Sequence, residues 1–150
     1  MMSRRTDIPT IWWGWLVAAF GLTALMSVGY VLFPDAMMRR TLISTFLGSP
    51  DALSAHGEEA MRLIGLLSGI SSAVSLAWMA ALTFVVLGPF RRGERWAWMS
   101  VATSVVIWFV VDSGRSIAAG FPSNAMFNVV WLVMYCVPLV ATYSQFTAAR

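Results

Sequence analysis

The chain alternates four long apolar blocks with short polar stretches. The apolar blocks run over residues 11–33, 63–87, 96–119 and 125–146. A bilayer core needs roughly 20 apolar residues per helix, so each block is long enough to cross one. The blocks lack the sustained two-residue alternation of membrane strands, and open sheet edges do not survive in lipid. The pattern therefore predicts an all-α, integral membrane four-helix bundle, with residues 1–150 forming a single transmembrane domain.

The three connections between these blocks differ in length. The second, 88–95, is a short basic turn, and the third, 120–124, is about five residues long, whereas the first, 34–59, is much longer. Apolar residues recur in the first connection at roughly helical spacing, namely Met38, Leu42, Ile43 and Phe46. Ser49-Pro50-Asp51 resembles the start of a further helix, and Gly57 a helix end. We therefore expect one or two short helices on the membrane surface here.

The composition supports a membrane location. Hydrophobic residues make up 59% of the chain and charged residues 11%, with a mean hydropathy of +0.73. A soluble domain is about a quarter charged, and one of this size cannot bury so much apolar surface. A soluble enzyme, a disordered tail and a disulfide scaffold are thereby excluded. The net charge is +3, but the arginines lie in short clusters rather than in a stripe, so membrane lipids and not nucleic acid are the expected partners.

The arginines also predict the orientation. With four spans, one side of the membrane carries six of them: Arg4, Arg5, Arg91, Arg92, Arg95 and Arg150. Arginine is enriched in cytoplasmic segments, and tryptophans cluster at the same ends of the first and third blocks. We therefore expect a multi-pass protein of the cell (inner or plasma) membrane with its N- and C-termini in the cytoplasm.

The third block contains two charged residues, Asp112 and Arg115. Ionisable residues within a membrane span are costly and are therefore candidates for function. The three-residue spacing places both on one helix face, near the outer boundary of the membrane. Two interpretations stay open at this stage: a structural ion pair, or a polar site that opens to the outer side.

Further polar residues are expected at the same level as this pair. They are Tyr30, Arg62, Ser68, Ser113, Ser116, Asn124 and Asn128. Together with Asp112 and Arg115 they could bind a polar head group while apolar tails lie among the helices, or they could form a hydrogen-bonded network without a ligand. Glu58 and Arg62, four residues apart, are also expected to pair on a helix surface.

The second block contains small residues at every fourth position. They are Gly65, Gly69, Ala73, Ala77 and Ala81. Such residues allow close helix packing, either within the bundle or against a second copy or another membrane subunit. In the fourth block Pro138 is expected to bend the helix and to leave a carbonyl one turn earlier without its donor.

Motifs for catalysis or metal binding are missing from the sequence. It contains no nucleophile elbow, phosphate loop or dinucleotide fingerprint. His56 is the single histidine, and the single cysteine, Cys136, lies deep in the fourth block, so no metal, haem or iron–sulfur site is expected. We predict no catalytic residue and no cofactor, although a bound lipid, quinone or pigment is compatible with the composition.

Two segments carry a resemblance to a known family. The first is Phe90-Arg91-Arg92-Gly93-Glu94-Arg95-Trp96-Ala97-Trp98, and the second is Asp112-Ser113-Gly114-Arg115, followed by a glycine, a proline and asparagines. With four spans and a long first connection, the chain resembles small bacterial membrane proteins of the DoxX-like kind. The resemblance implies a helical bundle and an accessory role, because some of those proteins accompany membrane oxidoreductases or quinone-linked systems. It implies no catalytic residue.

These observations favour one function over two others. The favoured one is a non-enzymatic membrane protein, either an accessory or scaffold subunit or a binder of a lipophilic molecule. The alternatives are a membrane redox or lipid-modifying enzyme component and a dimeric small transporter, both of which would use Asp112 and Arg115.

Overall fold

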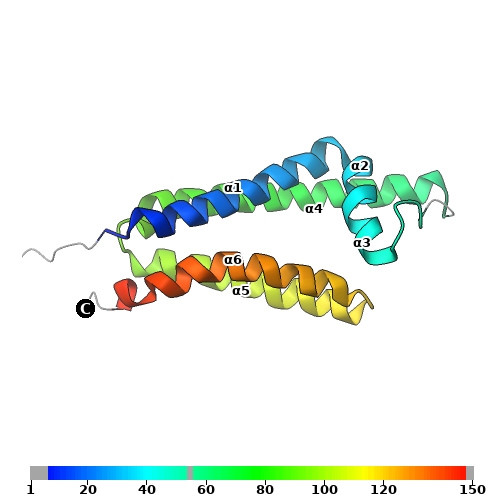
Figure 1. The fold of residues 1–150 in the computed structure, drawn as a ribbon. Coiled ribbons are helices and arrows are strands. Elements are labelled where there is room, and N and C mark those ends of the chain that lie inside the picture. Colours follow the sequence, from blue (N-terminus) through cyan, green and yellow to red (C-terminus); the bar gives the residue numbers. More distant parts are fainter. Residues whose placement is uncertain (1–6, 54–55, 148–150) are drawn as a thin grey trace, which may run out of the picture. The chain divides into compact units, whose positions relative to one another are not determined.

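The computed structural model describes residues 7–53 and 56–147, and within these ranges every regular element is helical. The four long helices are α1 (Thr10–Leu32), α4 (Gly57–Val85), α5 (Arg95–Ala118) and α6 (Pro122–Thr147) (Figure 1). Three short segments follow α1, namely α2 (Pro34–Met38), the π-helical turn η1 (Arg39–Ile43) and α3 (Ser44–Leu47). A second π-helical turn, η3 (Val86–Phe90), continues α4. Arg4, Arg5 and Arg150, used above for orientation, lie outside the described residues.

All four long helices are long and apolar enough to cross a membrane. This confirms the all-α class and the four candidate spans, while the packing into one bundle and the single domain stay predictions. The first, third and fourth helices match the predicted blocks closely, but the second helical segment, Gly57–Phe90, is longer than predicted. Gly57, expected to end a helix, instead begins α4 with a φ of 85°, a left-handed conformation that glycine adopts without strain.

The described chain divides into two compact units, and each is described by itself. One unit contains the residues up to Phe20 together with those from Ala81 onward. The other unit is the intervening segment, Gly21–Ala80. We call them the α5–α6 unit and the central unit.

In the central unit, the short segments of the first connection pack against the first turns of α4 (Figure 1). Met38 and Ile43 are buried together with Met61, which confirms short helices in this connection. The further helix expected at Ser49 is not formed among residues 48–53. Residues 50–53 form a turn instead, in which the Ser49 hydroxyl accepts a hydrogen bond from the backbone N–H of Asp51 at 3.3 Å.

The small residues of α4 lie in different environments. Gly65 is buried, and a Cβ atom there would lie 3.4 Å from Asp35 Oδ1, so its lack of a side chain allows α2 to approach α4 closely. A Cβ atom at Gly69 would meet no described atom within 4 Å. Ala73 and Ala77 are exposed. The role of the remaining members of this stripe in helix packing stays a prediction.

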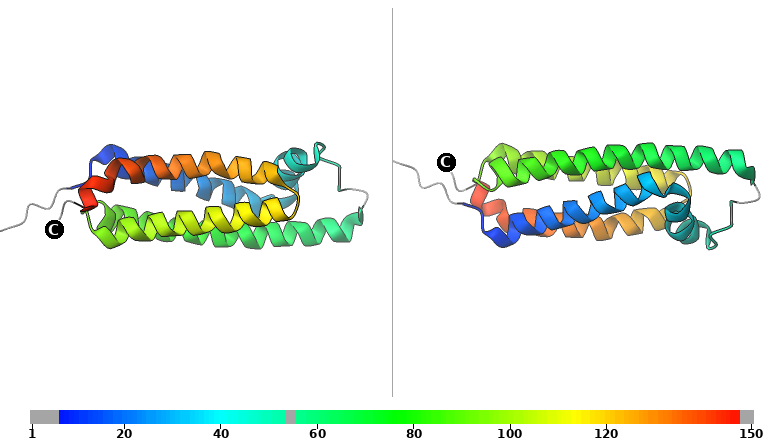
Figure 2. Two further views of the ribbon diagram at one scale, coloured as in Figure 1. Left: turned by 90° about the horizontal axis from the view of Figure 1, so that it is seen from below. Right: turned by 90° about the horizontal axis from the view of Figure 1, so that it is seen from above.

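In the α5–α6 unit, α5 and α6 run antiparallel and pack along each other (Figures 1 and 2). Apolar side chains from both helices are buried, including Val101 and Val105 of α5 and Leu139 of α6. Aromatic rings extend this core, since Tyr135 of α6 lies 5.5 Å from Phe20 of α1 between ring centroids. This packing explains why polar residues at the adjoining ends of α5 and α6 meet.

Pro138 lies inside α6, and the helix continues past it. Proline has no N–H, so the carbonyl of Met134 loses its usual helical donor, as the sequence predicts. The indole Nε1 of Trp15 donates to this carbonyl at 3.0 Å. The indole Nε1 of Trp98 donates to another carbonyl of α6, that of Leu139, at 2.9 Å. Tryptophan side chains therefore attach both α1 and α5 to the backbone of α6.

Candidate functional site

The candidate site is a polar cluster where the last turns of α5 meet the first turns of α6. Asp112, Ser113 and Ser116 lie on neighbouring positions of one side of α5. Asn124 and Asn128, four residues apart, lie on one face of α6. Because α5 and α6 are antiparallel and a short turn joins them, these five residues lie at the same level of the hairpin.

The five side chains form one hydrogen-bonded network. Asp112 Oδ2 accepts hydrogen bonds from Nδ2 of Asn124, at 3.1 Å, and from Nδ2 of Asn128. The Asn124 amide also donates to Ser116 Oγ at 2.7 Å, and the Asn128 amide donates to Ser113 Oγ at 3.1 Å. Ser116 Oγ donates in turn to the backbone carbonyl of Asp112 at 2.7 Å. Two amides thus hold the Asp112 carboxylate, and the hydroxyls of Ser113 and Ser116 accept the remaining N–H groups of these amides.

The deepest part of the network lies around Asn128. This side chain is 4% exposed and Ser113 is 6% exposed, whereas Asp112 is only half-buried. Asp112 Oδ1 accepts no hydrogen bond from the described residues and is not sealed off from the outside. Oδ2 is therefore hydrogen-bonded to the two amides of α6, whereas Oδ1 is available for a further hydrogen bond.

The ion pair between Asp112 and Arg115, one of the two interpretations left open by the sequence, is not among the salt bridges of the described residues. Arg115 is exposed, and it makes neither a salt bridge nor a hydrogen bond with its side chain to residues 7–53 or 56–147. Asp112 turns toward α6, where short amide side chains reach it with little loss of conformational entropy. A long arginine side chain near a helix end keeps its charged group at the polar boundary instead.

Tyr30 and Arg62 belong to the central unit, and each has a local partner there. The Tyr30 hydroxyl hydrogen-bonds with Thr41 Oγ1, which itself donates to the carbonyl of Met37 at 2.6 Å. Arg62 pairs with Glu58 at 3.3 Å on the surface of α4, which confirms the predicted helix-surface pair. The grouping of Tyr30 and Arg62 with Asp112 stays a prediction.

Comparisons with protein-family models, curated proteins and solved structures give no match to this chain. The site is therefore interpreted from its own geometry, and the resemblance to DoxX-like proteins stays a prediction. Among the described residues, no three histidine, cysteine, aspartate or glutamate side chains gather where they could hold a metal ion. The groups around Asp112 are amides and hydroxyls, which suit hydrogen bonding to a polar ligand.

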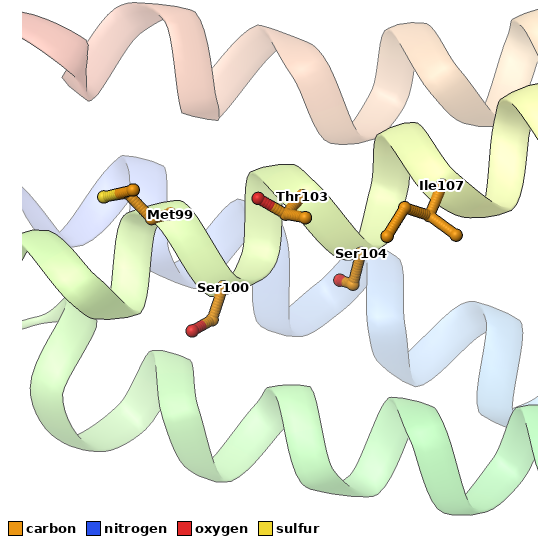
Figure 3. A pocket seen from close by; sticks show the side chains of 5 residues that line it. All are labelled: Met99, Ser100, Thr103, Ser104 and Ile107. Carbon is orange, nitrogen blue, oxygen red and sulfur yellow. The ribbon is translucent and has the colours of Figure 1, made fainter.

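A second feature, not anticipated from the sequence, lies in the first half of α5. It is a shallow depression of about 420 Å³, lined by Met99, Ser100, Thr103, Ser104 and Ile107. Figure 3 shows these five side chains on α5. Hydroxyl residues three and four positions apart in an apolar block were the signal that could have revealed it. Ser104 Oγ donates to the carbonyl of Val101 at 3.0 Å, as serines in apolar helices commonly do with their own backbone. This local bonding gives the depression a structural explanation without a ligand.

Proposed function

We propose that this chain is a non-enzymatic, multi-pass protein of the bacterial inner membrane that binds a lipophilic molecule with a polar head group. In this proposal both termini are cytoplasmic, and the Asp112 cluster lies near the outer membrane surface. The arginine and tryptophan distribution supports this orientation. The resemblance to DoxX-like proteins adds an accessory role, in which the bound molecule or the chain itself serves a larger membrane assembly.

The observation that carries the proposal is the asymmetry of the Asp112 carboxylate. A carboxylate in an apolar helix is costly unless hydrogen bonds stabilise it. The Asn124 and Asn128 amides supply this stabilisation at Oδ2 and leave Oδ1 open. An ammonium or hydroxyl group of a ligand fits this open oxygen as a hydrogen-bond donor.

The surroundings of Asp112 fit an amphiphilic ligand. Arg115, one turn further along α5, has no carboxylate partner among the described residues and would bind a phosphate or another acidic group of the same ligand. Large apolar side chains on the same parts of α5 and α6 are exposed, among them Val111 and Met126, and would contact acyl or isoprenoid tails. The polar head and the apolar tail of such a molecule would thus both find partners.

In the alternatives, Asp112 would pass a proton onward. A relay of titratable side chains beside the carboxylate would support general acid–base catalysis or proton-coupled transport. The side chains hydrogen-bonded to Asp112 are those of Asn124 and Asn128, and amides do not titrate near neutral pH. For this reason a binding role is preferred to the redox or lipid-modifying enzyme component and to the dimeric transporter.

The test is to purify the full chain in a mild detergent and to identify co-purified lipids and quinones by mass spectrometry. We expect Asp112→Asn, which keeps the side-chain shape but removes the charge, to lower the amount of retained ligand about tenfold, the range of a charge-assisted hydrogen bond. Thr103→Ala, on the same helix but outside the cluster, is the control and should retain the wild-type amount. Wild-type protein without any co-purified amphiphile, or equal retention in Asp112→Asn, would overturn the proposal.

A further inference from the structure

The basic turn, residues 91–95, lies at the opposite end of α5 from Asp112. It contains three exposed arginines, Arg91, Arg92 and Arg95, and one glutamate, Glu94. The turn belongs wholly to the α5–α6 unit. Its charges are independent of the Asp112 cluster, because 17 positions of α5, or about 25 Å, separate Arg95 from Asp112.

The backbone of the basic turn is well fixed. The N–H of Arg91 donates to the carbonyl of Val86 at 3.1 Å, and the N–H of Gly93 donates to the carbonyl of Phe90 at 2.9 Å. Gly93 has a φ of 73°, where a side chain would be strained. Phe90 is fully buried, with its ring centroid 4.9 Å from that of Phe146 in α6. The arginines therefore project from a fixed turn and not from a free loop.

The three arginines differ in their partners. Arg92 Nε donates to Glu94 Oε1 at 2.8 Å, and Trp96 Nε1 donates to Glu94 Oε2 at 2.8 Å. The charge of Arg92 is thereby balanced locally. Arg91 and Arg95 form no ion pair with any described residue, so two positive charges are left without an anion.

Aromatic and apolar groups surround these two charges. The guanidinium carbon of Arg91 lies 5.7 Å from the ring centroid of Trp13, a cation–π geometry that uses the face of the guanidinium and leaves its N–H edge free. Trp96, next to Arg95, is 54% exposed, and the nearby Leu87 and Met99 are also exposed. Arginine and tryptophan side chains next to exposed aliphatic side chains are typical of a membrane–water boundary.

We infer that Arg91 and Arg95 bind the phosphate of an anionic phospholipid in the adjoining leaflet. The guanidinium edges match phosphate oxygens in pairs, and the indoles of Trp13 and Trp96 lie at head-group level. Leu87 and Met99 contact the acyl chains. These apolar neighbours favour a lipid over free phosphate, because free phosphate has no apolar part that could contact them.

The test uses the full chain in detergent and measures the binding of palmitoyl-oleoyl phosphatidylglycerol by native mass spectrometry, with the zwitterionic phosphatidylcholine as reference. We expect Arg91→Gln and Arg95→Gln each to weaken phosphatidylglycerol binding about fivefold, the usual effect of one basic residue near a lipid surface. Arg40→Gln removes the same charge from an exposed position in η1 of the central unit, where Arg40 forms no ion pair with a described residue. This variant should leave the affinity for phosphatidylglycerol within twofold of the wild type.

Glu94→Gln removes the ion-pair partner of Arg92 and should change the affinity for phosphatidylglycerol in the opposite direction. It releases Arg92, so phosphatidylglycerol should bind more tightly than to the wild type. Arg91→Lys keeps the charge without the paired N–H edge, and it should bind with intermediate affinity while the turn stays folded. Equal losses in Arg40→Gln and Arg91→Gln, or the absence of any preference for phosphatidylglycerol, would overturn the inference. Full displacement of the lipid by millimolar inorganic phosphate would overturn the assignment to a lipid.

Discussion

Trp15 and Pro138 act on the same backbone carbonyl. Pro138 removes the helical donor that Met134 O would otherwise have, and the Trp15 indole, 119 residues away from Met134, supplies a replacement at 3.0 Å. An unpaired carbonyl is costly in an apolar environment. The proline is therefore tolerated inside α6 because α1 provides the missing hydrogen bond.

The first prediction concerns this replacement. Trp15→Phe keeps an aromatic ring but removes the donor, and it should lower the free energy of unfolding by about 1 kcal/mol, as for other hydrogen bonds between membrane helices. Pro138→Ala restores the backbone N–H to α6. In the Pro138→Ala background, Trp15→Phe should lower the free energy of unfolding by clearly less. A double-mutant cycle measured by SDS unfolding gives the difference between the two losses. An equal cost in both backgrounds would contradict the explanation.

The extent of the helices could be predicted from the sequence only where a long apolar block defines it. The limits of α1, α5 and α6 lie within three residues of the limits of their blocks, each long enough for a membrane span. The start of α4 was missed, because three of the six residues 57–62 are charged and this stretch does not continue the apolar block. Met61 is nonetheless buried against Met38 and Ile43, and this tertiary contact explains the extra helical turns.

The second prediction compares the two asparagines of the cluster. Asn128→Ala removes a donor from both Asp112 and Ser113 at a position that is 4% exposed, whereas Asn124 is only half-buried. We expect Asn128→Ala to lower the free energy of unfolding by about 1.5 kcal/mol and Asn124→Ala by less, within the range of membrane hydrogen bonds. Both variants can be compared by SDS or thermal unfolding. A larger loss in Asn124→Ala would contradict the assigned order of burial.

The third prediction follows from the missing ion pair. Arg115→Gln should change the free energy of unfolding by less than about 0.5 kcal/mol, as for an exposed charge without a partner. A buried pair would behave differently, since removing one member typically costs about 3–5 kcal/mol. Thermal unfolding of Arg115→Gln beside the wild type distinguishes the two cases. In the proposed function the same variant should still lose affinity for an acidic head group.

The members of the Asp112 cluster could be predicted from the sequence, but their pairing could not. The four-residue spacing of Asn124 and Asn128 and the short connection before them placed both near Asp112. The spacing of Asp112 and Arg115 also fits a pair on one helix, and sequence spacing does not show which partner a carboxylate prefers. That choice depends on the direction in which α6 approaches α5, which is a property of the packed hairpin.

The fourth prediction separates two glycines of α4 that belong to the same four-residue repeat of small residues. Gly65→Leu places a large side chain where Asp35 Oδ1 lies 3.4 Å from the nearest Cβ position, and it should cost about 1–3 kcal/mol by overpacking α2 against α4. Gly69→Ala meets no described atom within 4 Å, so its better helix propensity should leave stability unchanged or raise it by up to about 1 kcal/mol.

Unfolding in SDS measures both glycine variants, and chemical cross-linking in membranes measures association of the same proteins. If the stripe mediates contact between two copies, Gly69→Leu should reduce cross-linking while the unfolding of the monomer stays unchanged, because close approach of two helices requires a small residue there. Unchanged cross-linking in Gly69→Leu, together with a stability loss in Gly65→Leu, would restrict the role of the stripe to the contact between α2 and α4. That result would leave Gly65 as the member with a packing function, for the physical reason that α2 approaches α4 at this position.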